Sequence, residues 1–166
     1  MATLTCTVAD HVATITINRP DVLNAFNDAF SPEFIDTLKQ VDRDPAVRVV
    51  VITGAGRAFS SGQDLDDLKA KYVPGHVPHL GPDLKKRYDP WVKRLRNMEK
   101  PVIAAVNGVA AGAGCSLALA CDLRIASEHA KFIEVFVNVG LVPDSASTWV
   151  LPRLVGLGRA MDMCLT

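Results

Sequence analysis

The 166-residue sequence predicts an α/β fold, and three observations point to this class. Two runs of mostly β-branched or small apolar residues, Val47–Thr53 and Val102–Val106, lack the polar alternation of half-exposed strands, as is typical of strands buried on both faces. Each run leads into a glycine-rich turn and then into a helical pattern. Hydrophobic residues make up 49% of the chain, which is enough for one buried core, so residues 1–166 are expected to form a single domain.

The remaining elements follow from hydrophobic periodicity and from turn residues. Ser31 is expected to cap a helix that has Pro32 in its first turn. The segment Val73–Pro82 is rich in Pro, Gly and His and predicts a surface loop. We further expect strands at 3–8, 12–17, 122–126 and 130–132, and helices at 82–99, 114–120 and 145–154.

The overall charge excludes some classes of partner. Lys and Arg together number 18, and Asp and Glu also number 18, so the chain has no general electrostatic attraction to nucleic acid or anionic lipid. The run Val102–Cys121 has the length of a membrane span, but Asn107-Gly108 interrupts it with a turn signal. We therefore expect a buried strand, turn and helix there, and neither nucleic acid nor membrane as a partner.

The four cysteines show no C-x-x-C spacing, so neither a disulfide framework nor a zinc site is indicated. A reducing, cytoplasmic location is expected. His76 and His79 form an H-x-x-H pair, but no set of Cys or carboxylate ligands completes it, and a solvated loop is the favoured interpretation. No metal is expected.

Two glycine-rich turns carry the chemistry that the sequence indicates. The first follows Thr53 and runs through Gly54–Gly56 to Leu65, and the second is Asn107–Gly114. A helix start offers unpaired main-chain N–H groups and the positive end of the helix dipole. Glycine lets the main chain approach a ligand closely. Two such turns that converge could bind one oxygen on which negative charge develops.

Five segments together resemble the enoyl-CoA hydratase/isomerase, or crotonase, family over essentially the whole chain. They are Asn18-Arg19-Pro20 with Leu23–Ala25, Gly54–Leu65, Asn107–Gly114, Ala118–Asp122 and Leu141–Asp144. The resemblance implies an α/β spiral of repeated ββα units. Family members usually continue into C-terminal helices and assemble as trimers or dimers of trimers. Because the last residues follow a helical pattern without a C-cap, we expect the chain to lack that helical region.

The resemblance also implies the site. The oxyanion donors fall at the main-chain N–H groups of Gln63 and Ala113. No cofactor is expected beyond the coenzyme A of an acyl-CoA substrate. The acyl-CoA is expected to contact Leu23, Asn24, Ala25, Ala58, Ser60, Gly62, Asp64, Leu65, Gly112 and Gly114.

The acid–base residues decide which reaction follows. The two glutamates that the family's hydratases use are replaced here by Ser116 and Phe136, and Glu134 lies two residues from the second position. Asp144 resembles the catalytic aspartate of dienoyl-CoA isomerases and, more closely, of bacterial 1,2-epoxyphenylacetyl-CoA isomerases of phenylacetate breakdown. That second group usually has Gly-Gly where this chain has Ala146-Ser147. A competing interpretation makes Asp144 the N-cap of the next helix.

Three functions remain open at this point. The leading one is an acyl-CoA isomerase that uses Asp144, and the second is an enoyl-CoA hydratase that uses Glu134 or another carboxylate. The third is a non-catalytic acyl-CoA-binding module. The basic residues between 82 and 99 could contact CoA phosphates, although a solvated helix face is the commoner role of such a run.

Overall fold

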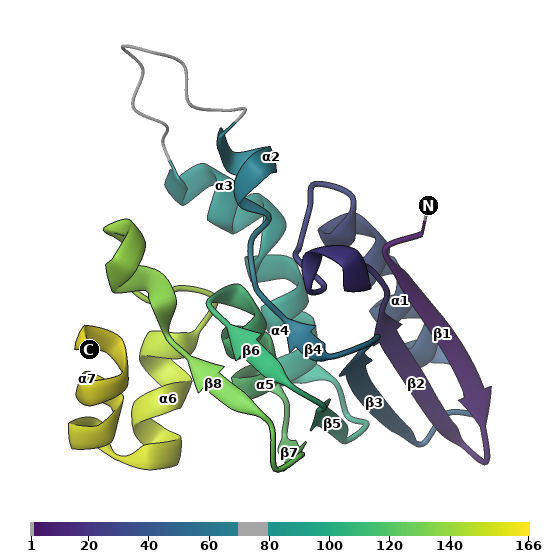
Figure 1. The fold of residues 1–166 in the computed structure, drawn as a ribbon. Helices are drawn as coiled ribbons and strands as arrows, with labels where there is room; N and C mark the ends of the chain where they lie inside the picture. Colours follow the sequence, from purple (N-terminus) through teal and green to yellow (C-terminus); the bar gives the residue numbers. More distant parts are fainter. Residues whose placement is uncertain (1, 70–79) are drawn as a thin grey trace.

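The described part of the chain forms a five-stranded and a three-stranded β-sheet with helices packed around them (Figure 1). The computed structural model describes residues 2–69 and 80–166. The strands are β1 (Leu4–Ala9), β2 (Val12–Ile17), β3 (Val49–Gly54), β4 (Ala58–Ser60), β5 (Val102–Val106), β6 (Val109–Ala111), β7 (Leu123–Ala126) and β8 (Lys131–Ile133). The helices are α1 (Phe30–Arg43), α2 (Leu65–Lys69), α3 (Leu80–Arg87), α4 (Asp89–Asn97), α5 (Ala113–Ala120), α6 (Ser147–Val155) and α7 (Leu157–Leu165), with short 3-10 helices η1 (Pro20–Val22) and η2 (Val135–Val139).

The topology is a spiral in which each turn adds one strand to each sheet. The larger sheet has the order β1-β2-β3-β5-β7, and the smaller sheet has the order β4-β6-β8. The β1–β2 pair is antiparallel, and every other pair in the two sheets is parallel. The units β3-β4-α2 and β5-β6-α5 therefore repeat one ββα theme, and β7-β8 begins a third. This arrangement confirms the α/β spiral that the sequence indicates.

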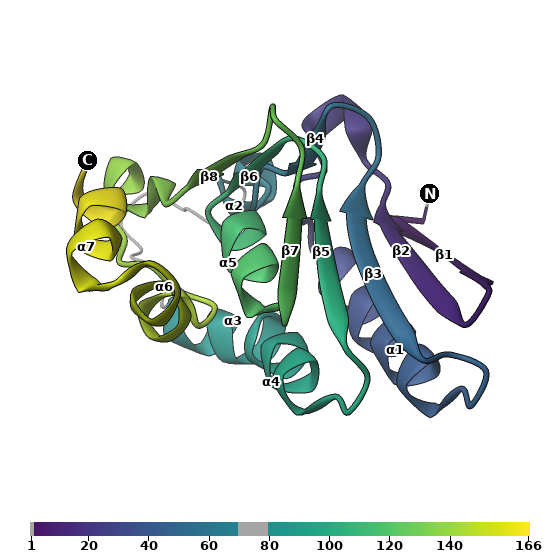
Figure 2. The same ribbon diagram turned by 90° about the horizontal axis from the view of Figure 1, so that it is seen from below.

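Most of the core lies between the larger sheet and the helices. In β2 and β3 every second residue is buried, and the alternate residues are only half-buried, so these strands do not bury both faces equally. The expectation of two fully buried faces for Val47–Thr53 is therefore wrong. Helix α1 packs its buried face, which includes Phe34 and Leu38, into the same cluster as Ile15 and Val50. Helices α6 and α7 lie at the end of the molecule opposite β1 (Figures 1 and 2).

Two helix starts differ from the sequence-based expectation. Helix α1 begins at Phe30 rather than after Ser31, because the side chain of Asn27 accepts a hydrogen bond from the Phe30 amide at 3.1 Å. The basic helix expected over 82–99 is two helices, α3 and α4, which meet at Tyr88. Pro90 lies in the first turn of α4, where a proline is tolerated.

The short strands β4 and β6 were not predicted, because they lie within the segments that the sequence indicates as glycine-rich turns. The strand and the helix expected within Val102–Cys121 are present as β5 and α5, and the turn expected between them also contains the strand β6. Of the helices in the described residues, none combines the length and the apolar character that crossing a membrane requires. The loop predicted at 73–82 falls mainly outside the described residues, and 80–82 belong to α3.

Candidate active site

The first glycine-rich turn is held against the segment that precedes α1. The Phe26 amide donates to the carbonyl of Gly62 at 2.7 Å, and the Asp64 amide donates to the carbonyl of Phe26 at 3.0 Å. These two bonds form a parallel bridge between Phe26 and Gln63, in which the N–H of Gln63 points away from Phe26. Gly62 has a φ of 88°, which favours glycine.

Polar side chains fix the route of this first turn. Asn24 is fully buried, and its amide group donates to the carbonyls of Ala55 at 2.9 Å and Ala58 at 2.8 Å. The hydroxyl of Ser60 donates to the carbonyl of Asn24 at 2.9 Å and accepts from the Gly62 amide at 3.1 Å. The side chains of Asn24 and Ser60 are thus engaged within the protein, and they shape the expected ligand path.

An ion pair between Arg19 and Asp64 fixes the C-terminal end of the first glycine-rich turn. Arg19 forms a 2.9 Å ion pair with Asp64 and donates to the carbonyl of Ala25 at 2.6 Å. Burial raises the pKa of Asp64, but the hydrogen bonds from Arg19 and from the Asp66 amide outweigh it, so the pKa lies below the ordinary value. The bond from the Asp66 amide to the Asp64 carboxylate also caps the start of α2. Leu65 is exposed beside it.

The second turn places the first residue of α5 against the first turn. Gly112, with a φ of 50°, precedes α5, and Ala113 is the first residue of the helix. A Cβ on Gly62 would lie 2.6 Å from the carbonyl oxygen of Ala111 and 3.0 Å from the amide nitrogen of Ala113. A Cβ on Gly114 would lie 2.5 Å from the carbonyl oxygen of Ser60. The two turns are therefore in main-chain contact.

Both expected oxyanion donors are unengaged. Throughout residues 2–69 and 80–166, neither the N–H of Gln63 nor that of Ala113 donates a main-chain hydrogen bond to a protein acceptor. For Ala113 this follows from its position, because the first N–H groups of a helix have no intrahelical partner. N–H donors of this kind, one of them at a helix N-terminus, can stabilise an oxyanion that develops on a bound ligand.

Asp144 lies in a turn just before α6. Its backbone carbonyl accepts from the hydroxyl of Ser116, on α5, at 3.2 Å, and its carboxylate accepts from the hydroxyl of Ser145 at 2.8 Å. Burial raises the pKa of Asp144, and the Ser145 bond only partly offsets this. Helix α6 begins at Ser147 after a left-handed Ala146, and no side chain caps it. The N-cap interpretation of Asp144 is therefore wrong.

Glu134 is buried in a hydrogen-bond network with two serines, Ser147 and Ser116. It is 3% exposed, and its carboxylate accepts from the hydroxyl of Ser147 at 3.0 Å. The hydroxyl of Ser147 also lies 2.9 Å from that of Ser116, so three buried side chains form one network. Burial raises the pKa of Glu134, with the hydrogen bonds from Ser147 and Cys115 opposing the rise. Phe136 is buried, as expected for a residue without a proton to transfer.

Sequence reasoning missed Tyr88, whose side chain contacts the first turn. Its hydroxyl donates a hydrogen bond to the side-chain carbonyl of Gln63. Burial raises the pKa of Tyr88, and the neighbouring Arg87 and Asp144 act on it in opposite directions. Tyr88 lies three residues before Trp91, a helical spacing that indicates a core residue. A buried tyrosine hydroxyl usually forms a hydrogen bond, and this is the only sign in the sequence that Tyr88 could contact the site.

The basic residues expected to line one helix are divided between α3 and α4, and most are paired. Arg87 lies 2.8 Å from Asp28, Arg94 lies 2.9 Å from Asp42, and Lys93 lies 3.5 Å from Asp89. This pairing favours the solvated-face interpretation over a phosphate site. Trp149 is 63% exposed, and the guanidinium of Arg153 lies over its ring.

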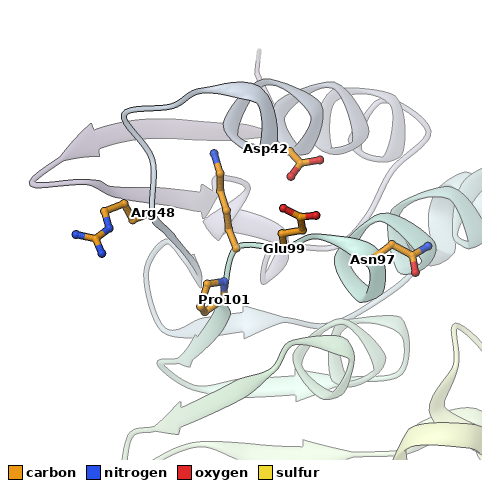
Figure 3. Close-up of a pocket in the computed structure, with 6 residues that line it drawn as sticks. Asp42, Arg48, Asn97, Glu99 and Pro101 are labelled. Atoms are coloured by element: carbon orange, nitrogen blue, oxygen red, sulfur yellow. The ribbon is translucent and has the colours of Figure 1, made fainter.

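Two surface pockets lie away from these turns, beside α1 and α4. One, of about 510 Å³, is lined by Asp42, Arg48, Asn97, Glu99, Lys100 and Pro101 (Figure 3). Its neighbour, of about 300 Å³, shares Asp42 and Asn97. Neither contains a residue of the two glycine-rich turns, and the geometry of the turns is the better guide to the site.

His76 and His79 lie outside the described residues, and the described residues contain no His, Cys, Asp or Glu cluster suited to a metal.

Comparison with known proteins identifies the class to which this fold and site belong. Residues 7–166 match the enoyl-CoA hydratase/isomerase family. The chain therefore belongs to the enoyl-CoA hydratase/isomerase family.

Relatives within this family have different named activities. The chain is 49% identical over 154 residues to the 1,2-epoxyphenylacetyl-CoA isomerase of Escherichia coli K12, covering 93% of this chain and 58% of the relative. It is 40% identical over 158 residues to a short-chain-enoyl-CoA hydratase of Clostridium acetobutylicum, with shares of 93% and 58%.

A solved structure confirms the fold. The crystal structure of an enoyl-CoA hydratase from Mycobacterium avium subsp. paratuberculosis superposes with a TM-score of 0.85 at 38% identity, covering 99% of this chain and 60% of that one. The chain thus spans about three-fifths of the length of these proteins.

Proposed function

We propose that the protein isomerises an acyl-CoA through a thioester enolate, with Asp144 as the group that moves the proton. The observation that carries the enolate is the pair of unengaged N–H groups of Gln63 and Ala113 on turns in main-chain contact. Negative charge that develops on the thioester oxygen would be stabilised there more strongly than the neutral carbonyl.

In this proposal Asp144 carries out both proton transfers. Its carboxylate takes a proton from one carbon of the acyl chain, and the electron pair passes to the thioester oxygen. The protonated Asp144 then returns the proton to a different carbon, and the carbonyl re-forms. The double bond moves, no water is added, and the substrate's coenzyme A is the only cofactor that the proposal requires. A raised pKa suits this role, because the group must both take and return a proton near neutral pH.

Hydration is the alternative, and the named hydratases among the relatives favour it. It needs carboxylates that position and activate water, and Ser116 and Phe136 occupy the positions that the family resemblance indicates. Glu134 has a raised pKa, but it is almost fully buried and hydrogen-bonded to Ser147. We therefore place isomerisation ahead of hydration.

The two functions separate with a pair of substrates. A 3-enoyl-CoA and a 2-enoyl-CoA are offered to the wild type and to Asp144→Asn, with Glu134→Gln as the matched carboxyl control. We expect movement of the double bond, a loss of about 10²- to 10⁴-fold in Asp144→Asn, and little change in Glu134→Gln. Rapid hydration that Asp144→Asn leaves intact would reject the isomerase in favour of the hydratase, and binding without turnover would favour a binding module.

The oxyanion hole itself is tested by Ala113→Pro. Ala113 is the first residue of α5, where proline fits a helix, so the change removes a donor without interrupting the helix. We expect a barrier higher by about 2.7–4 kcal/mol, the usual cost of one lost oxyanion donor. Equal rates for Ala113→Pro and wild type would remove the enolate mechanism.

Assembly and location are proposed from the surface and the thiols. Large apolar side chains of α6 and α7, including Trp149, Leu157 and Leu165, are exposed, which supports association into the trimers or dimers of trimers that the family resemblance implies. Sedimentation velocity of the protein tests this.

All four cysteines are free thiols, which supports the proposal of a reducing, cytoplasmic compartment.

A further inference from the structure

The aromatic side chains beside the first turn form a path that begins and ends at Gln63. The path begins where the main chain of Phe26 pairs with Gln63. From the ring of Phe26 to the ring of Tyr88, the centroids of successive aromatic rings lie 4.0, 5.2, 6.0 and 5.9 Å apart. It ends where the hydroxyl of Tyr88 donates to the side chain of Gln63. In order, the rings are those of Phe26, Phe30, Phe34, Trp91 and Tyr88.

Building on the proposed function, we propose that Tyr88 is a positioning residue for the first oxyanion donor. Phe26 holds the main chain of Gln63, and Tyr88 holds its side chain. The N–H that would meet the substrate oxygen lies between these two attachments. Tyr88 therefore acts through Gln63 and limits the directions in which this donor can point.

The surroundings of Tyr88 suit a fixed hydrogen-bond donor. Its ring is 5% exposed and packs edge-on against Trp91, so the hydroxyl has little freedom to move. Burial raises the pKa of Tyr88, so the hydroxyl keeps its proton across the physiological range. Gln63 supplies the matching acceptor, and its amide nitrogen donates to the carbonyl of Asp64 at 3.1 Å. Both ends of the Gln63 side chain are thus engaged.

The helices packed around Tyr88 also connect the elements that carry the two proposed donors. Tyr88 stands directly before α4, which packs against α1 and α5. Helix α5 carries Ala113 at its first position, so one set of packed helices supports both donors. Preorganised donors stabilise a transition state because they need no reorientation when charge develops. Removal of the Tyr88 hydroxyl leaves the turn in place but lets the donor direction vary.

The test uses a chromophoric probe together with turnover. Cinnamoyl-CoA absorbs at longer wavelength when its thioester carbonyl is polarised, so its red shift on binding reports the hole independently of turnover. In Tyr88→Phe we expect binding within about twofold of wild type, a smaller red shift, and a kcat lowered about 2- to 12-fold, the range of one neutral hydrogen bond. Gln63→Met keeps the main-chain donor but removes the bond from Tyr88 and also the bond to the Asp64 carbonyl, so it should lower the red shift and kcat at least as much.

A double-mutant cycle and a control complete the design. Because both changes remove the Tyr88–Gln63 bond, the double variant should be no slower than Gln63→Met alone. Thr37→Val removes another buried hydroxyl bond, 2.9 Å long within α1, and should leave the red shift and kcat unchanged. Additive losses, or an unchanged red shift and kcat in Tyr88→Phe, would overturn the role of Tyr88. A wild type that binds the probe without any red shift would reject the oxyanion hole itself.

Discussion

At the scale of single residues, the account depends on how burial changes the carboxyl groups. Because burial raises the pKa of Asp144, its basic form is lost at a higher pH than for an ordinary aspartate, near 3.9. We expect kcat/KM for isomerisation to fall as the pH drops through that raised pKa. A pH profile of kcat/KM checks this. An acid limb at or below the ordinary value would show that Asp144 is not the base.

In the proposed mechanism Glu134 transfers no proton, and its raised pKa instead predicts how stability depends on pH. A raised pKa in the folded state means that its contribution is complete below the unfolded value, near 4.3, and is lost as the pH rises through the folded value. Glu134→Gln cannot ionise, so it should match the wild type near pH 4 and be more stable at pH 8. Urea unfolding at the two pH values measures this, and a less stable variant at pH 8 contradicts it.

At the scale of elements, the close approach of the turns decides which glycines are replaceable. Alanine normally stabilises a helix relative to glycine, by about 1 kcal/mol. In α5 the Cβ of Gly114→Ala would meet the main chain of Ser60 at 2.5 Å, so we expect destabilisation and a loss of activity. Gly158→Ala, in α7, meets nothing within 4 Å and should be neutral or stabilising. Thermal unfolding and turnover of the two variants check this, and a Gly114→Ala protein as active as wild type would contradict the contact between turns.

The same scale shows what sequence patterns could predict. Strands of five or six residues, such as β2 and β5, have enough length for a pattern and were predicted to within a residue. The three-residue strands β4 and β6 form because the spiral places the turns side by side, which no local pattern records. The Gln63 and Ala113 donors were named from family resemblance, whereas Tyr88 depends on a contact across 25 positions that only the folded chain reveals.

At the scale of the whole molecule, the aromatic path is part of the core that holds the first turn. Phe30 is fully buried between Phe26 and Phe34. Phe30→Ala should cost about 3–5 kcal/mol of unfolding free energy, because it removes a large buried ring and leaves a cavity. Gln40→Ala, at an exposed site of the same helix, should change it by less than about 0.5 kcal/mol. Urea unfolding compares them, and equal effects would show that Phe30 is not a core residue.

The central claim is that two main-chain N–H groups meet one thioester oxygen. The most direct measurement is a crystal structure of the protein with a bound acyl-CoA. We expect the thioester oxygen to lie about 2.7–3.1 Å from the amide nitrogens of both Gln63 and Ala113. A bound acyl-CoA whose thioester oxygen lies beyond hydrogen-bond distance of either amide would contradict the enolate mechanism.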